Sequence, residues 1–428
     1  MTARTDPADA LRGAHRSTQH GTGWTQKSLV VGQAALSLVL LCAAGLLIQS
    51  LRNMRHQHLG FETSNRYILH IDPRMAGYTP EKLPAFYRQV HDVLSAIPGV
   101  SRASSALCSP MDGDNWSETV YIEGQAPPPP DSNRNNASWV RVSNDYFDAV
   151  GTKALKGRVF SDQDTASSRN VAVINQTFAK KLFKDEDPIG RHFGYFDAKY
   201  SGAFEIVGIT EDTQYRQPTG KIPPMFFLAA TQQMNFDDAR FKQFENVSHY
   251  LGAIVLMTQG NVPALEPQVR HALAQVNPDL AVIDFMSFTA QIDGNFSQQA
   301  MLTKLTSLFG LLALVLASVG LYGVTAYSVE RRTSEIGIRM ALGAGRADVL
   351  RLVLRGAFLQ IGIGLAIGIP ATILAGRAMT TQLFGVKPYA PDILLITTLV
   401  LSCAALIATV LPARRAAWLE PIRALRTE

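Results

Sequence analysis

The chain has 428 residues, of which 47% are hydrophobic, and a formal net charge of +5. Its three cysteines exclude a disulfide-rich fold. Its mean hydropathy of +0.05 averages long apolar stretches with a polar middle section. A wholly soluble protein is excluded, because four stretches reach the length of about 20 apolar residues that a membrane span needs.

The apolar stretches divide the chain into membrane spans, one polar domain and short charged segments. Three of the four stretches carry no charge inside, which disfavours buried core helices. The predicted fold class is an α-helical membrane protein with four transmembrane helices and a large α+β extracytoplasmic domain inserted between helices 1 and 2. In chain order, the predicted segments are a cytoplasmic tail at 1–27, helix 1 at 28–51, the external domain at 52–299, helix 2 at 305–327, a cytoplasmic turn at 328–352, helix 3 at 353–378, helix 4 at 392–412 and a cytoplasmic tail at 413–428.

The orientation follows from the basic residues, which concentrate on the cytoplasmic side of membrane proteins. Both tails and the 328–352 turn are rich in arginine, whereas the connection between helices 3 and 4 has only Lys387. Arg52 and Arg55 argue mildly for the opposite orientation, but the three other segments outweigh them. The net charge therefore reports membrane topology, and no nucleic-acid partner is predicted.

The external domain begins and ends with similar strand–helix units. A strand is predicted at 67–71, and Thr79-Pro80-Glu81 then supplies a hydroxyl cap, a proline and an acid to start a helix. Near the other end, strands at 253–257 and 280–285 flank a second helix. We expect both units to close one α+β subdomain, whose two parts are 52–103 and 245–299.

The segment between these units is expected to be a β-rich insertion at 104–244. Its β-branched and aromatic residues cluster in short runs. The predicted elements are strands at 119–123, 139–142, 171–174 and 204–209 and a helix at 175–183.

No catalytic constellation is found, so the chain is predicted not to be an enzyme. Residues 21–28 look briefly like a phosphate-binding loop, but Gln26 stands where the motif needs glycine, and a spacer before a membrane anchor is preferred. The loop that begins Asp112-Gly113 lacks the downstream glutamate of a Ca²⁺ loop, so a turn is preferred. No metal site and no cofactor site are predicted in this chain.

The charged turn between helices 2 and 3 has the pattern of a short surface helix. Glu335 and Arg339 stand four residues apart in the favourable order. Ile336 and Met340 share one face, which predicts an apolar stripe that lies on a surface with charges at its rim. Two interpretations stay open on spacing alone: contact with a protein, and a basic helix lying on anionic lipid.

Small residues in helix 3 predict close helix packing. Gly364 and Gly368 are four residues apart, as in small-xxx-small interfaces. The pattern supports either a bundle or a dimer.

Short motifs in the external domain and near the C-terminus carry a family resemblance. In the external domain these are residues 142–147, 173–175, 187–190 and 205–208, and later in the chain 322–345 and 412–426. Together and in this order, they resemble the periplasmic core domain, the second span with its cytoplasmic coupling helix, and the C-terminal signature of MacB/FtsX-type ABC transporter permeases. The resemblance covers nearly the whole chain.

The resemblance implies a non-catalytic permease subunit of an export or mechanotransmission system in the bacterial inner membrane. A separate cytoplasmic ABC ATPase would bind ATP, dock on the coupling helix and move the spans and the periplasmic domain. A periplasmic adaptor and membrane lipid are further implied partners. The alternative is an FtsX-like envelope regulator that activates a cell-wall hydrolase or another periplasmic partner. The docking role is carried over to Glu330, Arg331, Arg332, Glu335, Ile336, Gly337, Arg339, Leu342, Gly343 and Ala344.

The chain also resembles the second half of longer, eight-span permeases that contain this unit twice. Unlike MacB, it is expected to lack a fused nucleotide-binding domain. We therefore expect a homodimer or a pair with a second permease. A split or truncated form of a longer permease is the other interpretation.

Overall fold

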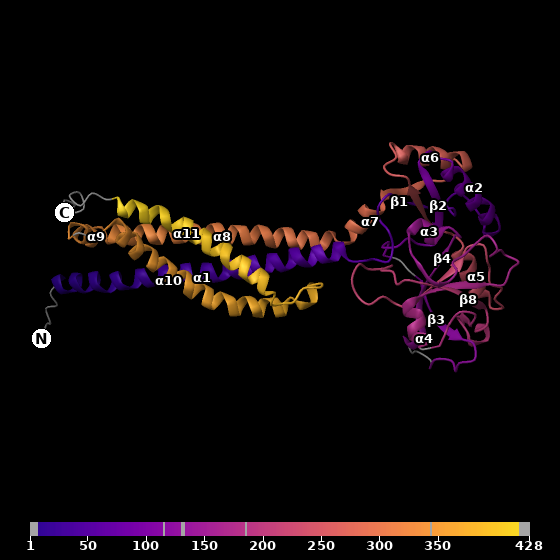
Figure 1. Ribbon diagram of the computed structural model, residues 1–428, viewed down its shortest axis with the longest axis horizontal. Helices are drawn as coiled ribbons and strands as arrows, with labels where there is room; N and C mark the ends of the chain where they lie inside the picture. The colour runs from indigo at the N-terminus through magenta and orange to yellow at the C-terminus, as the bar shows by residue number, and fades with distance from the viewer. Residues whose placement is uncertain (1–6, 114–115, 130–132, 185, 343–344, 419–428) are drawn as a thin grey trace. The chain divides into compact units, whose positions relative to one another are not determined.

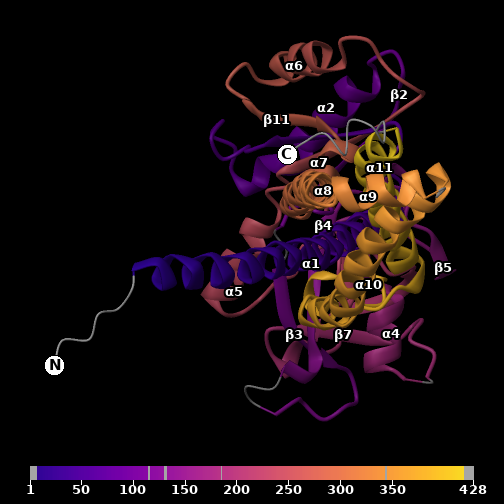
Figure 2. The ribbon, with the colours of Figure 1, turned by 90° about the vertical axis from the view of Figure 1, so that its left-hand side faces the viewer.

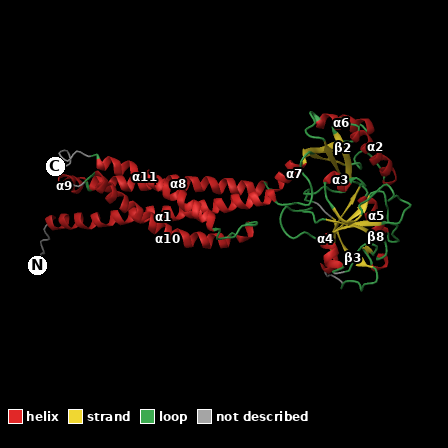
Figure 3. Ribbon diagram, viewed as in Figure 1, coloured by secondary structure: helices red, strands yellow, loops and turns green. Residues whose placement is uncertain are grey.

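The computed structural model describes residues 7–113, 116–129, 133–184, 186–342 and 345–418, with side chains from Thr25 onward. It divides into two compact units. The first contains the chain up to His56 and from Gln298 onward, and the second is Gln57–Ser297. Figure 1 colours both units along the chain, and Figure 3 shows that the described strands belong to the second unit.

The helices of the first unit form because a backbone in lipid must satisfy its hydrogen bonds internally. Among the described residues, four helices are long and apolar enough to cross a membrane. They contain the four predicted spans, which confirms that part of the predicted fold. The stretch at 21–28 is helical as part of α1 and therefore does not form a phosphate-binding loop. The helices are α1 (Pro7–His56), α8 (Ser297–Arg331), α9 (Thr333–Ala341), α10 (Arg346–Ala378) and α11 (Pro391–Ala417).

Small residues allow α10 to run closely along α1. A Cβ added to Gly364 would lie 2.8 Å from the Cβ of Ala34, and one added to Gly368 would lie 3.2 Å from the Cα of Ala35. Larger residues at either glycine would push the helices apart. Both glycines thus lie at a contact inside the chain's own bundle, which Figure 2 views toward the end that carries α9.

Polar side chains hold α8 and α11 to α1. The Ser37 hydroxyl donates a hydrogen bond of 2.9 Å to the carbonyl of Ala313 in α8. Cys42 Sγ and Thr397 Oγ1, from α1 and α11, lie 2.8 Å apart. Such interhelical hydrogen bonds contribute roughly 0.6–2 kcal/mol each in a membrane.

The two ends of the second unit build an antiparallel sheet with the strand order β11-β1-β10-β2. α2 and α6 share a buried apolar core with this sheet, which includes Phe86, Val90, Val269 and Leu273. The β-α-β-β-α-β order is ferredoxin-like, and it confirms the predicted strand–helix units. The elements are β1 (Arg66–Ile71), α2 (Leu83–Ser95), β2 (Val100–Ala106), β10 (Ala253–Thr258), α6 (Leu265–Val276) and β11 (Val282–Ser287).

The middle of the unit forms a closed ring of strands. The order is β4-β3-β7-β8-β6-β9, β9 returns to pair with β4, and β5 pairs with β8. Trp139, Phe193, Tyr195 and Phe226 are buried in its core, where the Trp139 and Phe226 rings stack with centroids 5.9 Å apart. The strands are β3 (Trp116–Ile122), β4 (Asn136–Val142), β5 (Ala154–Gly157), β6 (Val171–Asn175), β7 (His192–Tyr195), β8 (Phe204–Thr210) and β9 (Met225–Ala229), and the helices are α3 (Tyr146–Val150), α4 (Gln176–Leu182) and α5 (Ala239–Ser248). The remaining helix, α7 (Phe288–Asn295), follows β11 and packs against β1 and β11.

The four predicted strands and the helix of this middle segment are confirmed, but the segment does not separate from the flanking sheet. β2 pairs with β10 along its length and with β4 at Ala106 and Val142. The expected boundary at residue 104 therefore falls inside β2, and the one at 244 falls inside α5. The ring and the ferredoxin-like sheet share one continuous hydrogen-bonded sheet.

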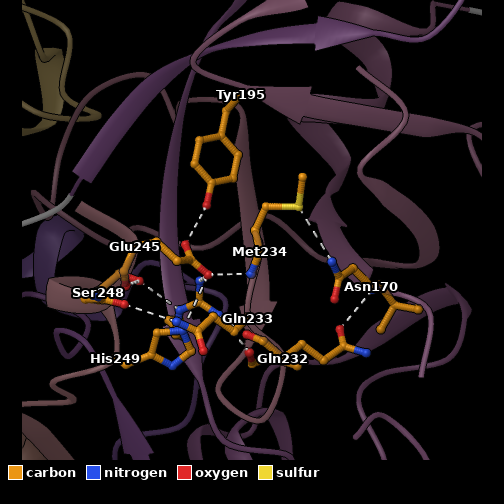
Figure 4. Close-up of polar contacts among 12 residues, drawn as sticks. Asn170, Tyr195, Gln232, Gln233, Met234, Glu245, Ser248 and His249 are labelled. Carbon is orange, nitrogen blue, oxygen red and sulfur yellow. Dashed lines mark hydrogen bonds and ion pairs between the residues drawn. The ribbon is translucent and has the colours of Figure 1, made fainter. Parts of the chain in front are cut away.

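A buried ion pair fastens α5 to the ring. The Arg141 guanidinium in β4 lies 2.9 Å from the carboxylate of Glu245 in α5, and each side chain is only 1% exposed. A buried charge is tolerated when it is paired and hydrogen-bonded, and both conditions are met here (Figure 4). Further hydrogen bonds to this pair come from or go to Tyr195, Ala229, Gln232, Met234 and Ser248.

These contacts shift the acidity of the cluster. Burial by itself raises the pKa of Glu245, but the Arg141 charge, His249 and the Met234 amide outweigh it and lower that pKa to about 2. Burial and the same Arg141 charge lower the pKa of His249. The folded unit therefore favours a charged Glu245 beside a neutral His249.

Candidate functional site

α9 is a short helix set off from α8 by a change of backbone direction at Arg332 (φ −106°, ψ 14°). The Thr333 hydroxyl donates to the carbonyls of Val329 and Glu330, at 3.1 and 2.8 Å, and so satisfies carbonyls at the end of α8. At the far side, Asp348 accepts a hydrogen bond of 3.1 Å from the Gly345 amide, and α10 starts there. Local hydrogen bonds thus fix where α9 begins and where the next span starts.

The inner face of α9, which we define as Ile336, Gly337 and Met340, packs into the chain's own bundle. Ile336 is 2% exposed and lies in an apolar cluster with Val329 of α8, Val349 of α10 and Ala416 of α11, with Met340 partly buried against it. The expectation that Ile336 and Met340 form the stripe offered to a partner is therefore wrong. That stripe holds α9 to its own spans.

The outer face of α9 consists of Glu335, Ile338, Arg339 and Leu342, which recur at the i, i+3, i+4, i+7 spacing of one helix side. The Glu335 carboxylate and the Arg339 guanidinium lie 2.7 Å apart. Ile338 is 49% exposed and Leu342 is 82% exposed. This face thus presents two apolar side chains beside an ion pair, a composition suited to contact with another protein.

The other predicted docking residues fall into three groups. Glu330, Arg331 and Arg332 are exposed around the corner between α8 and α9. Gly337 is buried with the inner face. Gly343 and Ala344 lie outside the described residues. Ile338 was not among the predicted residues, although its i, i+4 spacing to Leu342 was a signal for it.

The end of α11 supports the same region. Ala413 and Ala416, both from the stretch that resembles a C-terminal signature, are 0% exposed. Arg415 donates a hydrogen bond of 3.1 Å to the Tyr322 hydroxyl of α8. The Arg346 guanidinium lies 4.3 Å from the centroid of the Trp418 ring. Small buried residues and exposed arginines thus hold α8, α10 and α11 together next to α9.

In the second unit, the segment that follows α1 is anchored by its backbone. The Glu62 amide donates to the Val150 carbonyl at 2.9 Å, and the Thr152 hydroxyl donates to the Gly60 carbonyl at 2.9 Å. Gly60 has a φ of +80°, and a Cβ there would collide with the Asp212 carbonyl oxygen, so glycine is required. This segment cannot shift without disturbing the domain around it.

The segment that precedes α8 is anchored as firmly. Gln291 of α7 donates to the Ser109 hydroxyl and the Pro110 carbonyl, at 2.9 and 2.8 Å. Asn295 donates to the Met111 carbonyl at 2.7 Å. Both chain segments next to the spans are therefore built into the second unit.

The fold and these surfaces define a membrane-spanning protein with a large α+β domain and a short exposed helix after its second span. The family described as "MacB-like periplasmic core domain" matches residues 29–276, and the family described as "FtsX-like permease C-terminal" matches residues 307–421. The chain belongs to the MacB/FtsX-type ABC transporter permeases, as the sequence resemblance predicted. It is accordingly a membrane protein with a periplasmic domain.

Two export proteins are among its curated relatives. The macrolide export ATP-binding/permease protein MacB 2 of Aeromonas hydrophila subsp. hydrophila is 27% identical over 343 residues, which cover 76% of this chain and 50% of the relative. The pyoverdine export ATP-binding/permease protein PvdT of Pseudomonas putida is 26% identical over 416 residues, which cover 95% of this chain and 57% of the relative. The chain thus spans about half the length of these relatives.

Among solved structures, the periplasmic region of MacB from Actinobacillus actinomycetemcomitans is similar with a TM-score of 0.34 and 14% identity, covering 54% of this chain and 92% of that one. The extracellular domain of the noncanonic ABC-type transporter YknZ from Gram-positive bacteria has a TM-score of 0.32 and 13% identity, covering 51% and 100%.

Proposed function

We propose that this chain is the permease subunit of an ABC-type export or mechanotransmission system in the bacterial inner membrane. A separate cytoplasmic ATPase binds ATP and docks on the outer face of α9. The observation that carries this proposal is that the two faces of α9 differ in burial. Ile336 is buried in the bundle, while Ile338 and Leu342 are exposed beside an ion pair.

The location of α9 supports a cytoplasmic partner. α8 joins the periplasmic domain to α9 and is long and apolar enough to cross a membrane once, which supports a cytoplasmic position for the outer face of α9. The names of both relatives describe ATP-binding/permease proteins, and the ATP-binding part is what a partner subunit would supply here.

The packing of α9 supports transmission of movement. Because Ile336 contacts residues of α8, α10 and α11, a partner that displaces α9 must also displace those spans. At the other membrane face, the chain passes directly from α8 to α7, whose Gln291 and Asn295 are hydrogen-bonded within the periplasmic domain. ATP-driven movement of the partner would thus reach that domain through covalent and packed connections.

A charge exchange on the outer face of α9 tests the docking. In Glu335→Arg/Arg339→Glu the net charge is unchanged and a pair can still form within the helix, so α9 should stay folded. We expect loss of co-purification with the cognate ATPase, because each exchanged charge would face the wrong partner charge. The matched control is Glu266→Arg/Arg270→Glu on α6, a pair with the same i, i+4 spacing and a 2.7 Å separation. Unchanged co-purification of the α9 variant would refute the assignment.

The assembly is proposed to contain a second permease, either another copy or a different chain, because the sequence resembles one half of the longer, eight-span permeases that contain this unit twice. A periplasmic adaptor remains a further proposed partner. The export names of the relatives do not favour the alternative of a regulator that activates a cell-wall hydrolase.

A further inference from the structure

A deep groove lies inside the first unit, between α1, α8 and α10, beside the start of α9. Its volume is about 660 Å³, large enough for part of a lipid-sized molecule. Along α10 it extends from Leu352 to Ile367, a helical rise of roughly 22 Å. The groove is therefore about as long as one membrane leaflet, headgroups included, is deep.

The two ends of the groove differ in chemistry. Lys27 of α1 and Arg332 next to α9 line the end near the turn, and both side chains are exposed. Further along, the lining includes the exposed apolar side chains Leu359, Ile363 and Ile367. The described lining contains no aspartate or glutamate, so nothing within it neutralises the two cations.

The lining leaves space and an unsatisfied polar atom. A Cβ added to Gly32 or Gly356 would meet no atom within 4 Å, although both glycines line the groove. The buried Oε1 of Gln360 also lines it and has no hydrogen-bond partner among the described residues. The bundle thus stays open here, one turn from where Gly364 is tightly packed against α1.

We propose that this groove binds one anionic phospholipid from the cytoplasmic leaflet. The phosphate pairs with Lys27 and Arg332, and one acyl chain lies along Leu359, Ile363 and Ile367. Basic pockets between transmembrane helices on the cytoplasmic side recognise anionic head groups in this way. A transmembrane helix of a second copy is apolar and would leave both cations without a counter-charge, so lipid is the better occupant.

A lipid in this groove would have a role that is separate from ATPase docking. Arg332 is the residue between α8 and α9, and the inner-face residue Ile336 also lines the groove. A bound head group therefore holds the corner from which α9 departs. The lipid site does not depend on the ATPase, and it can be tested in its absence.

The test is native mass spectrometry of the full chain released from nanodiscs of phosphatidylcholine with or without phosphatidylglycerol. We expect one retained phosphatidylglycerol per chain and no retained phosphatidylcholine. Lys27→Gln/Arg332→Gln should weaken retention about thirtyfold, since each basic residue near an anionic lipid contributes about 1 kcal/mol. The control Arg351→Gln/Arg355→Gln removes two exposed arginines of α10 that lie outside the groove, and it should retain the lipid.

A second pair of variants tests the apolar part. A Cβ added to Gly356 meets open space within the groove, so Gly356→Leu should fill it and exclude the acyl chain. Gly362→Leu, where a Cβ also meets open space but outside the groove, should not. Three results overturn the proposal: equal retention of phosphatidylglycerol and phosphatidylcholine, equal loss of lipid from Lys27→Gln/Arg332→Gln and from the control Arg351→Gln/Arg355→Gln, or equal lipid retention by the two leucine variants. So does a cysteine cross-link at Gly356 between two copies in intact membranes, because another chain then occupies the groove.

Discussion

Replacing Ile336 with alanine should release α9 from the bundle without touching its outer face. The Ile336 side chain is 2% exposed and packs on Val329, Val349 and Ala416. Removing a buried isoleucine side chain typically costs about 2–5 kcal/mol. Local opening of α9 should therefore become at least about thirtyfold more frequent.

Hydrogen exchange of the amides of residues 333–341 measures this opening in the full chain in nanodiscs. The matched control is Ile338→Ala on the outer face, where the side chain is 49% exposed and the expected change is within about 0.5 kcal/mol. ATPase binding should depend on the two residues in the opposite order: Ile338→Ala should weaken it more than Ile336→Ala, because Ile338 contacts the ATPase directly. If Ile336→Ala leaves exchange unchanged, or if both variants change it equally, the inner and outer faces have been assigned incorrectly.

Two further predictions concern the periplasmic domain. Glu245→Gln should destabilise it by about 3–5 kcal/mol, because Arg141 is left buried without its counter-charge. Urea unfolding followed by tryptophan fluorescence measures this loss. The control Glu205→Gln removes one partner of an ion pair with Arg169 in which both side chains are at least partly exposed, and it should cost less than about 1 kcal/mol. Burial lowers the pKa of His91 and of His249, so the unfolded chain takes up protons below about pH 6.5 that the folded domain does not. Stability should therefore fall from pH 6.5 toward the lowered pKa values, and further from about pH 4.5 as Glu245, with a pKa of about 2, loses its advantage. Equal stability at pH 5 and pH 7.5 would contradict this assignment.

The membrane spans and the outer strand–helix units were predictable because their signals are local. A span is an uninterrupted apolar run, and an amphipathic helix such as α2 carries its buried side at fixed spacing through Phe86 and Val90. Both patterns are set by the burial of single elements, and neither depends on which distant residues meet.

The features that the sequence did not reveal depend on such distant contacts. α9 carries two apolar pairs, Ile336 with Met340 and Ile338 with Leu342, and periodicity alone could not tell which pair faces the bundle. Similarly, Arg141 lies in a predicted strand, but its partner Glu245 lies 104 residues away, in a helix that the sequence pattern does not predict. The closed strand ring also escaped prediction, because its closure requires β4 and β9 to pair.

The most direct test of the central claim is photo-crosslinking from the outer face of α9. A photoreactive amino acid replaces Ile338 in one variant and Ile407, an exposed residue within the α11 span, in the other. The account predicts an adduct between position 338 and the cognate ATPase in intact membranes, and none from position 407. Failure of position 338 to crosslink while the ATPase is present and active, or equal crosslinking from both positions, would contradict it.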